Sequence, residues 1–273
     1  MRKFLSLFFL VYWIHSVSAQ ENYEIQVYGS RTMDKGATMF ELHSNFTFAG
    51  EKQIVEGVNP TYHSLHETLE ITQGVTDNFE IGFYVFTNFA NPYGYKVIGA
   101  HIRPRVRVPE KWNWPVGVSL STEIGYQSRQ YSQDTWSLEI RPIIDKQWGK
   151  FYVSFNPTFG ISIKSDSNTH TPTFEPNLKA SFTLNKLALG IEYYGDVGPV
   201  NDVRKISEQS HSLFLVADVY GDPRWEINFG PGFGLTKKAD AFIFKLIVGR
   251  RVSWKSGHQK TSGYRRSASL SSL

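Results

Sequence analysis

The clearest indication of the fold is the stretch Phe151-Tyr152-Val153-Ser154-Phe155-Asn156-Pro157-Thr158-Phe159-Gly160-Ile161-Ser162-Ile163-Lys164. Every odd position in it holds an apolar residue, whereas the even positions are mainly polar or small. Successive side chains of a β-strand point to opposite faces, so this alternation predicts a strand with one apolar and one polar face. Beyond Ala19 no segment keeps the 3.6-residue apolar period of a helix, and we expect almost no helical structure.

The same alternation recurs from about residue 37 to residue 254, and its phase is reset at each turn. It predicts about twelve strands, each close to the ~10 residues that a tilted membrane strand requires. The apolar faces of these strands contain, in chain order, Phe40, Leu69, Phe83, Ile102, Leu120, Leu138, Phe155, Leu178, Leu189, Leu215, Phe229 and Phe244. The pattern is weakest around Leu69.

The two faces of these strands also differ in composition. One set of faces carries nearly all the Phe, Leu, Ile and Val with almost no charge, and the other carries acids, bases, Ser, Thr, Asn and Gly. A barrel whose exterior meets lipid and whose lumen is polar gives this partition directly. We therefore predict an all-β fold, a transmembrane up-and-down antiparallel β-barrel of about 12 strands.

The predicted connections alternate in length along the chain. The shorter ones are 74–78, 109–114, 145–150, 185–186 and 221–223, and the longer ones are 49–60, 89–96, 128–134, 165–171, 195–210 and 236–240. Outer-membrane barrels have short periplasmic turns and longer loops outside, and an even number of strands returns both termini to the periplasmic side. The pattern thus favours an outer-membrane barrel with periplasmic termini.

Tryptophans cluster at the shorter connections. Trp112, Trp114 and Trp148 lie within them, and Trp225 follows one directly. Indole rings favour the interface between membrane and water, so these residues are typical of an aromatic girdle. The alternative is that they are ordinary half-buried residues of turns.

Five prolines fall inside predicted strands, namely Pro104, Pro142, Pro157, Pro176 and Pro231. A closed barrel has no edge strand at which a missing N–H would be harmless. All five share the outward parity, so each would place an apolar ring toward lipid. We expect bulges or strand ends to absorb the lost hydrogen bonds.

The N-terminus is typical of an exported protein. Arg2 and Lys3 precede an apolar run from Phe4 to Ile14, and small residues lead to Ala19, so we expect residues 1–19 to be a cleaved signal peptide. There is no cysteine, which excludes disulfides and a lipobox. The predicted location is the outer membrane of a Gram-negative bacterium, where membrane lipids would surround the barrel.

The other boundaries follow from the barrel, which we place at residues 37–254. Residues 20–36 would form a periplasmic lead-in or an inner plug, and the basic, Ser-rich residues 255–273 would be a disordered tail. Gly249, Val252 and Trp254 partly match the C-terminal signal that barrel proteins present to their insertion machinery. We therefore expect the barrel-assembly machinery as a partner during insertion.

The candidate functional residues are charged side chains of inward parity. They are Arg103, Arg105, Arg107, Arg141, Lys179, His101, Glu80, Glu123, Glu139, Glu175, Glu192 and Glu226. Hairpin order places Glu80 and Glu123 on either side of the row formed by the first three arginines. One hypothesis is a structural network of ion pairs that fills the lumen, since buried charges persist only when paired. The other is a selectivity lining, in which the arginine row attracts an anionic solute.

Nothing in the chain predicts catalysis, a metal or a cofactor. The His-Ser neighbours at 43–44, 63–64 and 211–212 would point to opposite faces of a strand, whereas a working pair needs a spacing of two. Histidines and carboxylates show no tight metal-ligand spacing, and no phosphate-binding glycine motif is present. The formal net charge of +4, part of which leaves with the signal peptide, gives no electrostatic support for nucleic-acid binding.

Three segments carry a resemblance to a known family. They are Glu70-Ile71-Thr72-Gln73-Gly74-Val75-Thr76-Asp77-Asn78-Phe79-Glu80-Ile81-Gly82, Gly190-Ile191-Glu192-Tyr193-Tyr194-Gly195 and Asn228-Phe229-Gly230-Pro231-Gly232-Phe233-Gly234-Leu235-Thr236. Over roughly residues 37–254 the chain resembles the outer-membrane barrels associated with the meta-pathway of phenol degradation. The resemblance implies a barrel with a transport role and does not identify phenol as the solute.

Together these observations favour a channel or transporter for small solutes, with anionic and aromatic molecules as the candidates. One alternative is an outer-membrane hydrolase that modifies lipid. The other is a sealed structural or surface barrel, for which the loop at 195–210 would be the contact site.

Overall fold

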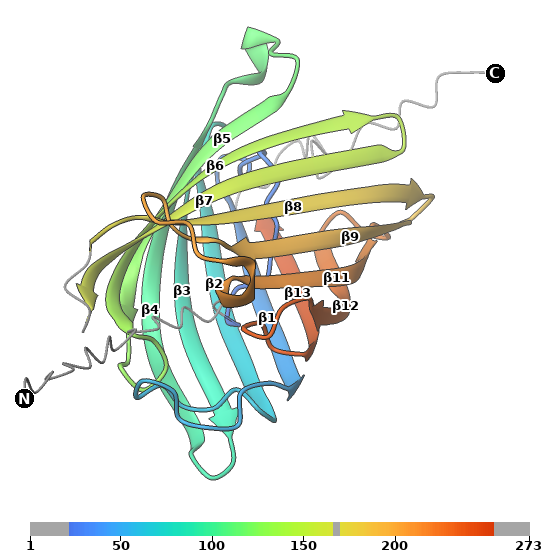
Figure 1. The fold of residues 1–273 in the computed structure, drawn as a ribbon. Coiled ribbons are helices and arrows are strands. Elements are labelled where there is room, and N and C mark those ends of the chain that lie inside the picture. The colour runs from blue at the N-terminus through green and yellow to red at the C-terminus, as the bar shows by residue number, and fades with distance from the viewer. Residues whose placement is uncertain (1–21, 166–169, 254–273) are drawn as a thin grey trace, which may run out of the picture.

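The computed structural model describes residues 22–165 and 170–253. The predicted signal peptide and C-terminal tail lie outside these residues, as does Trp254. Twelve long antiparallel strands make up almost all of the described chain (Figure 1). They are β1 (Ala37–Ala49), β2 (Ser64–Thr76), β3 (Phe79–Ala90), β4 (Gly94–Arg107), β5 (Gly117–Gln127), β6 (Asp134–Trp148), β7 (Phe151–Ser165), β8 (Thr173–Leu184), β9 (Leu187–Asp196), β11 (Ser210–Val219), β12 (Trp225–Gly234) and β13 (Phe242–Ser253).

Three short elements complete the described structure. The two-residue strand β10 (Gly198–Pro199) pairs with the start of β8, and η1 (Glu110–Trp112) and η2 (Ile206–Glu208) are single 3-10 turns. Among the described residues no helix is long and apolar enough to cross a bilayer. The expectation of almost no helical structure is confirmed for this part of the chain.

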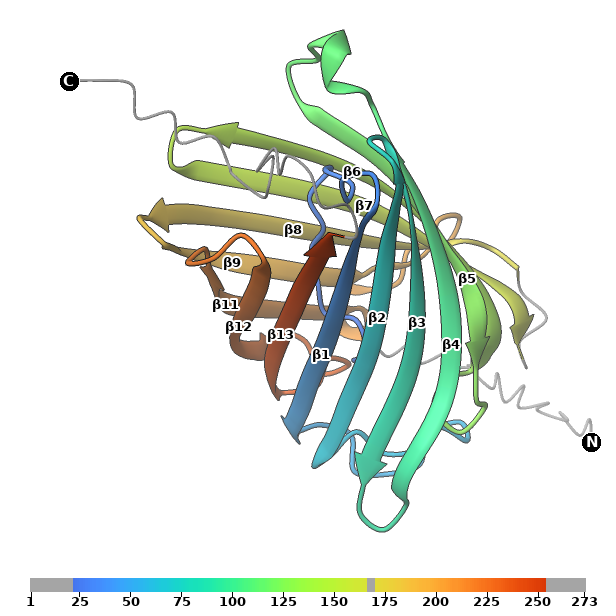
Figure 2. The ribbon, with the colours of Figure 1, turned by 180° about the vertical axis from the view of Figure 1, so that it is seen from behind.

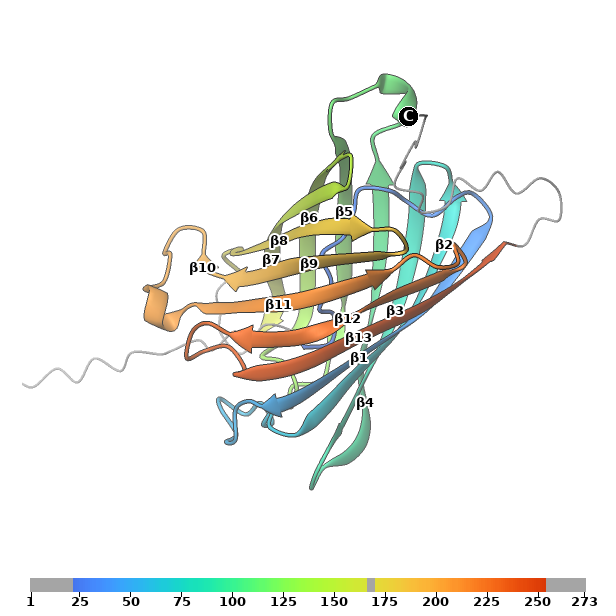
Figure 3. The ribbon, with the colours of Figure 1, turned by 90° about the vertical axis from the view of Figure 1, so that its right-hand side faces the viewer.

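The strands close into a barrel. Each long strand pairs with its neighbours in the chain, and β1 pairs with β13 from Ala37↔Ser253 to Ala49↔Phe242. Figures 2 and 3 show this closure, with the red β13 directly beside the blue β1. Closure gives every long strand two partners, so no long edge strand is left open to aggregation. The predicted barrel of about twelve strands is confirmed.

The connections fall into two groups, at opposite ends of the barrel. One end, here called the turn end, has the connections 77–78, 108–116, 149–150, 185–186 and 220–224, and the other, the loop end, has 50–63, 91–93, 128–133, 166–172, 197–209 and 235–241. The predicted asymmetry therefore holds with two exceptions. The connection 108–116 contains η1 and is not the tight turn expected there, and 91–93 is shorter than expected. Ala37 and Ser253 both lie at the turn end.

The interior of the barrel is mainly polar, with two small apolar clusters around Phe214 and Phe86, and its exterior is apolar. On β2 the side chains of Ser64, His66, Thr68, Glu70 and Thr72 are all buried. The alternate residues point outward, and the apolar residues among them are partly exposed, as Leu69 is. In a protein that folds in water, the large apolar side chains would occupy the interior. The observed inversion is that of a barrel whose exterior contacts lipid.

The five prolines lie within β4, β6, β7, β8 and β12. Beside several of these prolines, the pairing between neighbouring strands is interrupted and then resumes in the same register. Between β6 and β7, for example, the pairs run to Ile140↔Phe159 and continue from Ile144↔Phe155, and Pro142 and Pro157 lie in the gap. The register shifts lie elsewhere, as at Phe86 and Thr87. The expectation that bulges absorb the prolines is therefore wrong for this pair, because the barrel omits ladder bonds there without shifting its register.

Residues 22–36, here called the N-terminal segment, run through the lumen. Near the loop end, Asn22 donates a hydrogen bond to Asp240, at 2.5 Å. Near the turn end, the backbone N–H of Gly36 donates to the carbonyl of Gly74, at 2.9 Å. Of the two expected arrangements, a periplasmic lead-in and an inner plug, the structure shows this segment inside the barrel.

Candidate functional site: the charged lumen

The twelve predicted lumen residues differ in how far they are buried. Eight are buried, namely His101, Arg103, Arg105, Arg141, Lys179, Glu80, Glu123 and Glu192. The other four, Arg107, Glu139, Glu175 and Glu226, are half-buried. The alternation of the strands is sufficient to explain why they share the inner surface.

Arg103 is the centre of the first ionic cluster. Its guanidinium contacts Glu70 at 2.7 Å and Glu80 at 3.2 Å, and Arg105 contacts the same Glu80 at 2.7 Å. Arg105 also donates to the backbone carbonyls of Gly29, at 3.1 Å, and Arg31, at 2.8 Å. The arginine row is thus compensated partly by carboxylates of the barrel wall and partly by the backbone of the N-terminal segment.

Tyr28 of the N-terminal segment lies among three guanidinium groups. The centroid of its ring is 4.9 Å from the guanidinium carbon of Arg103, 5.5 Å from that of Arg105 and 4.8 Å from that of Arg141. Cations are attracted to the face of an aromatic ring within about 6 Å. Tyr28 also donates its hydroxyl hydrogen to Glu24. The segment therefore presents an aromatic ring to the most basic part of the lumen.

The second cluster joins β6 to the N-terminal segment. Arg141 contacts Glu24 at 3.2 Å and Glu139 at 2.7 Å. The register of β4 with β5, which pairs Ile102 with Ile124 and Arg105 with Ser121, puts Glu123 opposite Arg103 of the arginine row. The carboxylate of Glu123 also lies 2.6 Å from Nδ1 of His101, the preceding inward residue of β4.

The third cluster contains two lysines. Lys179 lies 2.8 Å from both Glu192 and Asp218, and Lys245 also pairs with Glu192. Lys245 donates to the backbone carbonyl of Ile25 as well, at 3.0 Å. Each buried carboxylate here faces a cation, which is the condition for keeping charges in a confined lumen.

Four charged residues of these clusters were missing from the predicted set, namely Glu24, Glu70, Asp218 and Lys245. Lys245 and Asp218 show the inward parity in the sequence, which is a signal that could have found them. Glu70 lies on the weakest of the predicted strands, and Glu24 lies before the first one. Glu70 does share the polar parity of that strand, between Leu69 and Ile71. Glu24 alternates with Tyr23 and Ile25, but its segment forms no strand of the barrel, so this parity does not indicate a lumen position.

Three of the half-buried residues lie apart from these clusters. Arg107 pairs with the exposed Glu110 near the turn end, at 2.9 Å, and this hydrogen bond lowers the pKa of Glu110. Glu175 accepts a hydrogen bond from Thr173 at 2.7 Å. Glu226 lines the cavities described next.

A cavity of about 830 Å³ occupies the turn-end half of the lumen. Its walls include three connections of the turn end, 108–116, 185–186 and 220–224, together with residues of the N-terminal segment between Gln26 and Arg31. Lys179, Glu192, Asp218 and Glu226 line it as well. It is large enough for a small solute and presents charges of both signs.

At the loop end, Asp240 joins two loops to the N-terminal segment. It accepts hydrogen bonds from Asn22 at 2.5 Å, from Thr61 at 2.6 Å and from the backbone N–H of Glu51 at 3.3 Å. Burial raises the pKa of Asp240 above its usual range, and these hydrogen bonds offset that effect only in part. The N-terminal segment is thus anchored at both ends of the lumen.

Comparison with known proteins bears on the fold. No family model and no curated protein matches the sequence. Solved structures that match include the KdgM porin, with a TM-score of 0.51 at 10% identity over 81% of this chain and 99% of its own. The chain has the fold of an outer-membrane porin. The NanC porin agrees, with a TM-score of 0.50 at 8% identity over 80% of this chain and 100% of its own.

At such identities the likeness extends to the porin fold and to nothing finer. The resemblance to the family of the meta-pathway of phenol degradation finds no support from the family models. The porin fold does account for the inverted polarity of the barrel, since such barrels have a polar lumen.

Proposed function

We propose that this protein is an outer-membrane channel for small solutes. The observation that carries the proposal is a porin fold with a polar lumen and a cavity of about 830 Å³ at its turn end. The apolar exterior would contact lipid, and the turn end, with its shorter connections, would face the periplasm. The interior is suited to hydrated solutes, because polar and charged side chains line it.

The N-terminal segment acts in this proposal as a displaceable plug. It spans the lumen and accepts or donates hydrogen bonds along its length, with partners that include Asn45, Thr68, Ser154 and Lys245. These partners belong to the wall of the barrel, so the barrel itself does not need the segment for strand pairing. Its withdrawal would join the turn-end cavity to the loop end.

The same geometry supports anionic and aromatic molecules as the solutes that pass through the proposed channel. When the segment withdraws, Arg105 loses the carbonyls of Gly29 and Arg31, and Arg141 loses Glu24. The open lumen then carries guanidinium groups with fewer partners, which favours anions. The place of Tyr28 among three guanidiniums is also one that the ring of an aromatic solute could take.

Conductance in a planar lipid bilayer tests this proposal. We expect the full chain to conduct poorly and a variant lacking residues 22–33 to conduct well with a preference for anions. Arg105→Ala in the shortened variant should reduce that preference and leave the size of the pore similar. A shortened variant that inserts in folded form and does not conduct would contradict the channel.

A sealed barrel is the second candidate, and the pairing of the lumen charges favours it. Lys179 and Lys245 both face Glu192, and Arg103 and Arg105 both face Glu80. Such a network also stabilises a closed interior. In that case Arg105→Ala would lower the stability of the barrel, and neither form of the protein would show ion selectivity.

A further inference from the structure

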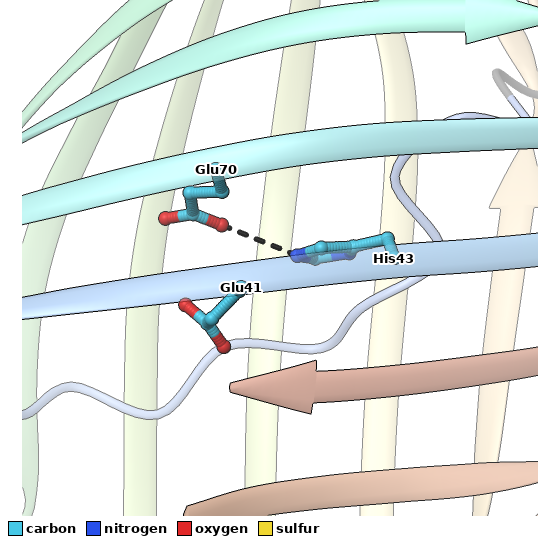
Figure 4. Close-up of side chains that lie close together, drawn as sticks. All are labelled: Glu41, His43 and Glu70. Atoms are coloured by element: carbon cyan, nitrogen blue, oxygen red, sulfur yellow. Dashed lines mark ion pairs between the residues drawn. The ribbon is translucent and has the colours of Figure 1, made fainter. Parts of the chain in front are cut away.

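Three side chains, of which only Glu70 belongs to an ion pair described above, face one another in the lumen. Glu41 and His43 of β1 and Glu70 of β2 point into one space between the barrel wall and the N-terminal segment (Figure 4). One ligand atom from each residue lies within 4.8 Å of the others. His43 and Glu70 are fully buried, and Glu41 is 7% exposed.

The register of the first hairpin creates this group. Glu41 and His43 are two residues apart on one strand, so their side chains share a face. Glu70 lies directly opposite Glu41 in the pairing of β1 with β2. Two carboxylates directly opposite each other repel, and the repulsion is stronger away from water. A cation between them would remove that cost.

Two buried atoms of the group, Oε1 of Glu41 and Nδ1 of His43, have no hydrogen-bond partner. Nε2 of His43 and Oε2 of Glu70 lie 3.3 Å apart as an ion pair and have no other partner (Figure 4). Buried polar atoms are nearly always hydrogen-bonded, so a buried carboxylate oxygen without a partner beside this pair points to a ligand.

The other oxygen of Glu70 is firmly held. Oε1 accepts hydrogen bonds from Arg103 at 2.7 Å and from Thr72 at 2.5 Å. These contacts orient the carboxylate so that Oε2 is directed toward His43 and Glu41. Metal-binding carboxylates are commonly oriented by hydrogen bonds of this kind.

Charge and space also favour a cation. The residues that line the small cavity beside this group include five acids and four arginines, namely Asp34, Glu41, Glu70, Glu80, Glu226, Arg31, Arg103, Arg105 and Arg251. Glu41 and Glu70 line this cavity, whose volume is about 40 Å³. This volume exceeds the ~10–15 Å³ that a water-sized particle needs.

We propose that Glu41, His43 and Glu70 bind a divalent transition-metal ion, with Zn²⁺ as the best match. Zn²⁺ accepts imidazole nitrogen and carboxylate oxygen together and often keeps a fourth position for water. Mg²⁺ and Ca²⁺ prefer oxygen ligands alone. The ligands are Oε1 of Glu41, Nε2 of His43 and Oε2 of Glu70. The sequence alone predicts no metal site, because Glu70 joins the other two residues only through the strand register.

Zinc titration of the folded full-length chain in detergent micelles tests the site. After removal of metals with a chelator, we expect one Zn²⁺ per chain, measured by competition with a chromophoric chelator. His43→Asn and Glu41→Gln should each weaken this binding at least tenfold. His66→Asn is the matched control, because His66 is also buried in the lumen on β2 but lies outside the group, and it should leave the binding unchanged. Excess Mg²⁺ should not compete.

Two further measurements keep the proposal testable if a variant fails to fold. Co²⁺ added to the unmutated chain should give the intense visible absorption of a tetrahedral site, and a spectrum equal to that of free Co²⁺ would overturn the proposal. Zn²⁺ should also raise the melting temperature of the unmutated chain and not that of Glu41→Gln. The absence of stoichiometric binding, or equal binding by His43→Asn, would show that the group holds water or that zinc binds elsewhere.

Discussion

Arg103 is the residue of the arginine row that pairs with two carboxylates of the barrel wall. Its guanidinium contacts two buried carboxylates, so Arg103→Ala leaves Glu70 and Glu80 short of a partner. Breaking a buried ion pair on one side costs about 3–5 kcal/mol. We expect a loss of this size in the free energy of unfolding, measured with urea in micelles.

The matched control for this substitution is Arg107→Ala. Arg107 belongs to the same row but pairs with the exposed Glu110, and such pairs contribute about 0–1 kcal/mol. Equal losses for the two variants would show that the lumen around Arg103 is filled with water and that its ion pairs are weak.

Asp240 makes the loop end sensitive to pH. Burial raises the pKa of its carboxyl in the folded chain, so the folded state holds this proton more tightly than the unfolded state does. The stability that this group contributes is therefore present at acidic pH and is lost as pH rises through the folded pKa. We expect the unmutated chain to gain stability relative to Asp240→Asn as pH falls from 7 toward 4, in paired unfolding curves. A constant difference between the two chains would contradict the assignment.

At the scale of the strand, apolar residues on the outer face should tolerate charge according to their depth in the membrane. Val85 lies in the middle of β3 and Val97 near the start of β4, and both side chains are exposed on the exterior. Arginine on the lipid face costs about 2–4 kcal/mol at the midplane and about 0–1 near the interface.

We therefore expect Val85→Arg to destabilise the barrel in lipid vesicles by several kcal/mol and Val97→Arg to have little effect. Refolding and unfolding in vesicles of defined thickness would measure both changes. If the two substitutions were equally harmless, water rather than lipid would contact this face, and the membrane assignment would fail.

The strands could be predicted from the sequence because the two-residue alternation of apolar and polar residues is visible within each segment by itself. The first strand begins at Ala37, and even the weak pattern around Leu69 forms a full strand, β2. Partners across the lumen could not be predicted in the same way. Lys245 and Glu192 lie on β13 and β9, which are separated by two other strands, so only the closed barrel brings them together.

In the candidate site, too, the inward direction of side chains could be predicted from the sequence, and their contact partners could not. The inward parity of the arginine row could be predicted, whereas the contact of Glu123 with His101 could not, because the register puts Glu123 opposite Arg103 and the side-chain conformations bring it to the histidine. The partners from the N-terminal segment, Glu24 and Tyr28, lie in a short alternating run that forms no strand of the barrel, so the run does not indicate which wall residues they contact. Their positions follow from tertiary contacts, which local sequence patterns do not encode.

For the whole molecule, the path of the N-terminal segment separates the first and last described residues, Asn22 and Ser253, in space. Ser253 and Ala37 lie at the turn end, but Asn22 lies beside Asp240 at the loop end. If the turn end faces the periplasm, Asn22 lies on the cell-surface side of the barrel. This topology is unlike that of a barrel with both termini in the periplasm, which the even number of strands alone would give.

An epitope placed directly before Asn22 tests that topology. We expect antibodies to label it on intact cells, since the segment carries it to the loop end. The same epitope inserted in the turn 149–150 should be labelled only after the outer membrane is permeabilised. If the first epitope also needed permeabilisation, the N-terminal segment would not thread the lumen in the cell. If instead only the turn epitope were labelled on intact cells, the barrel would have the opposite orientation, and the large cavity would open to the outside.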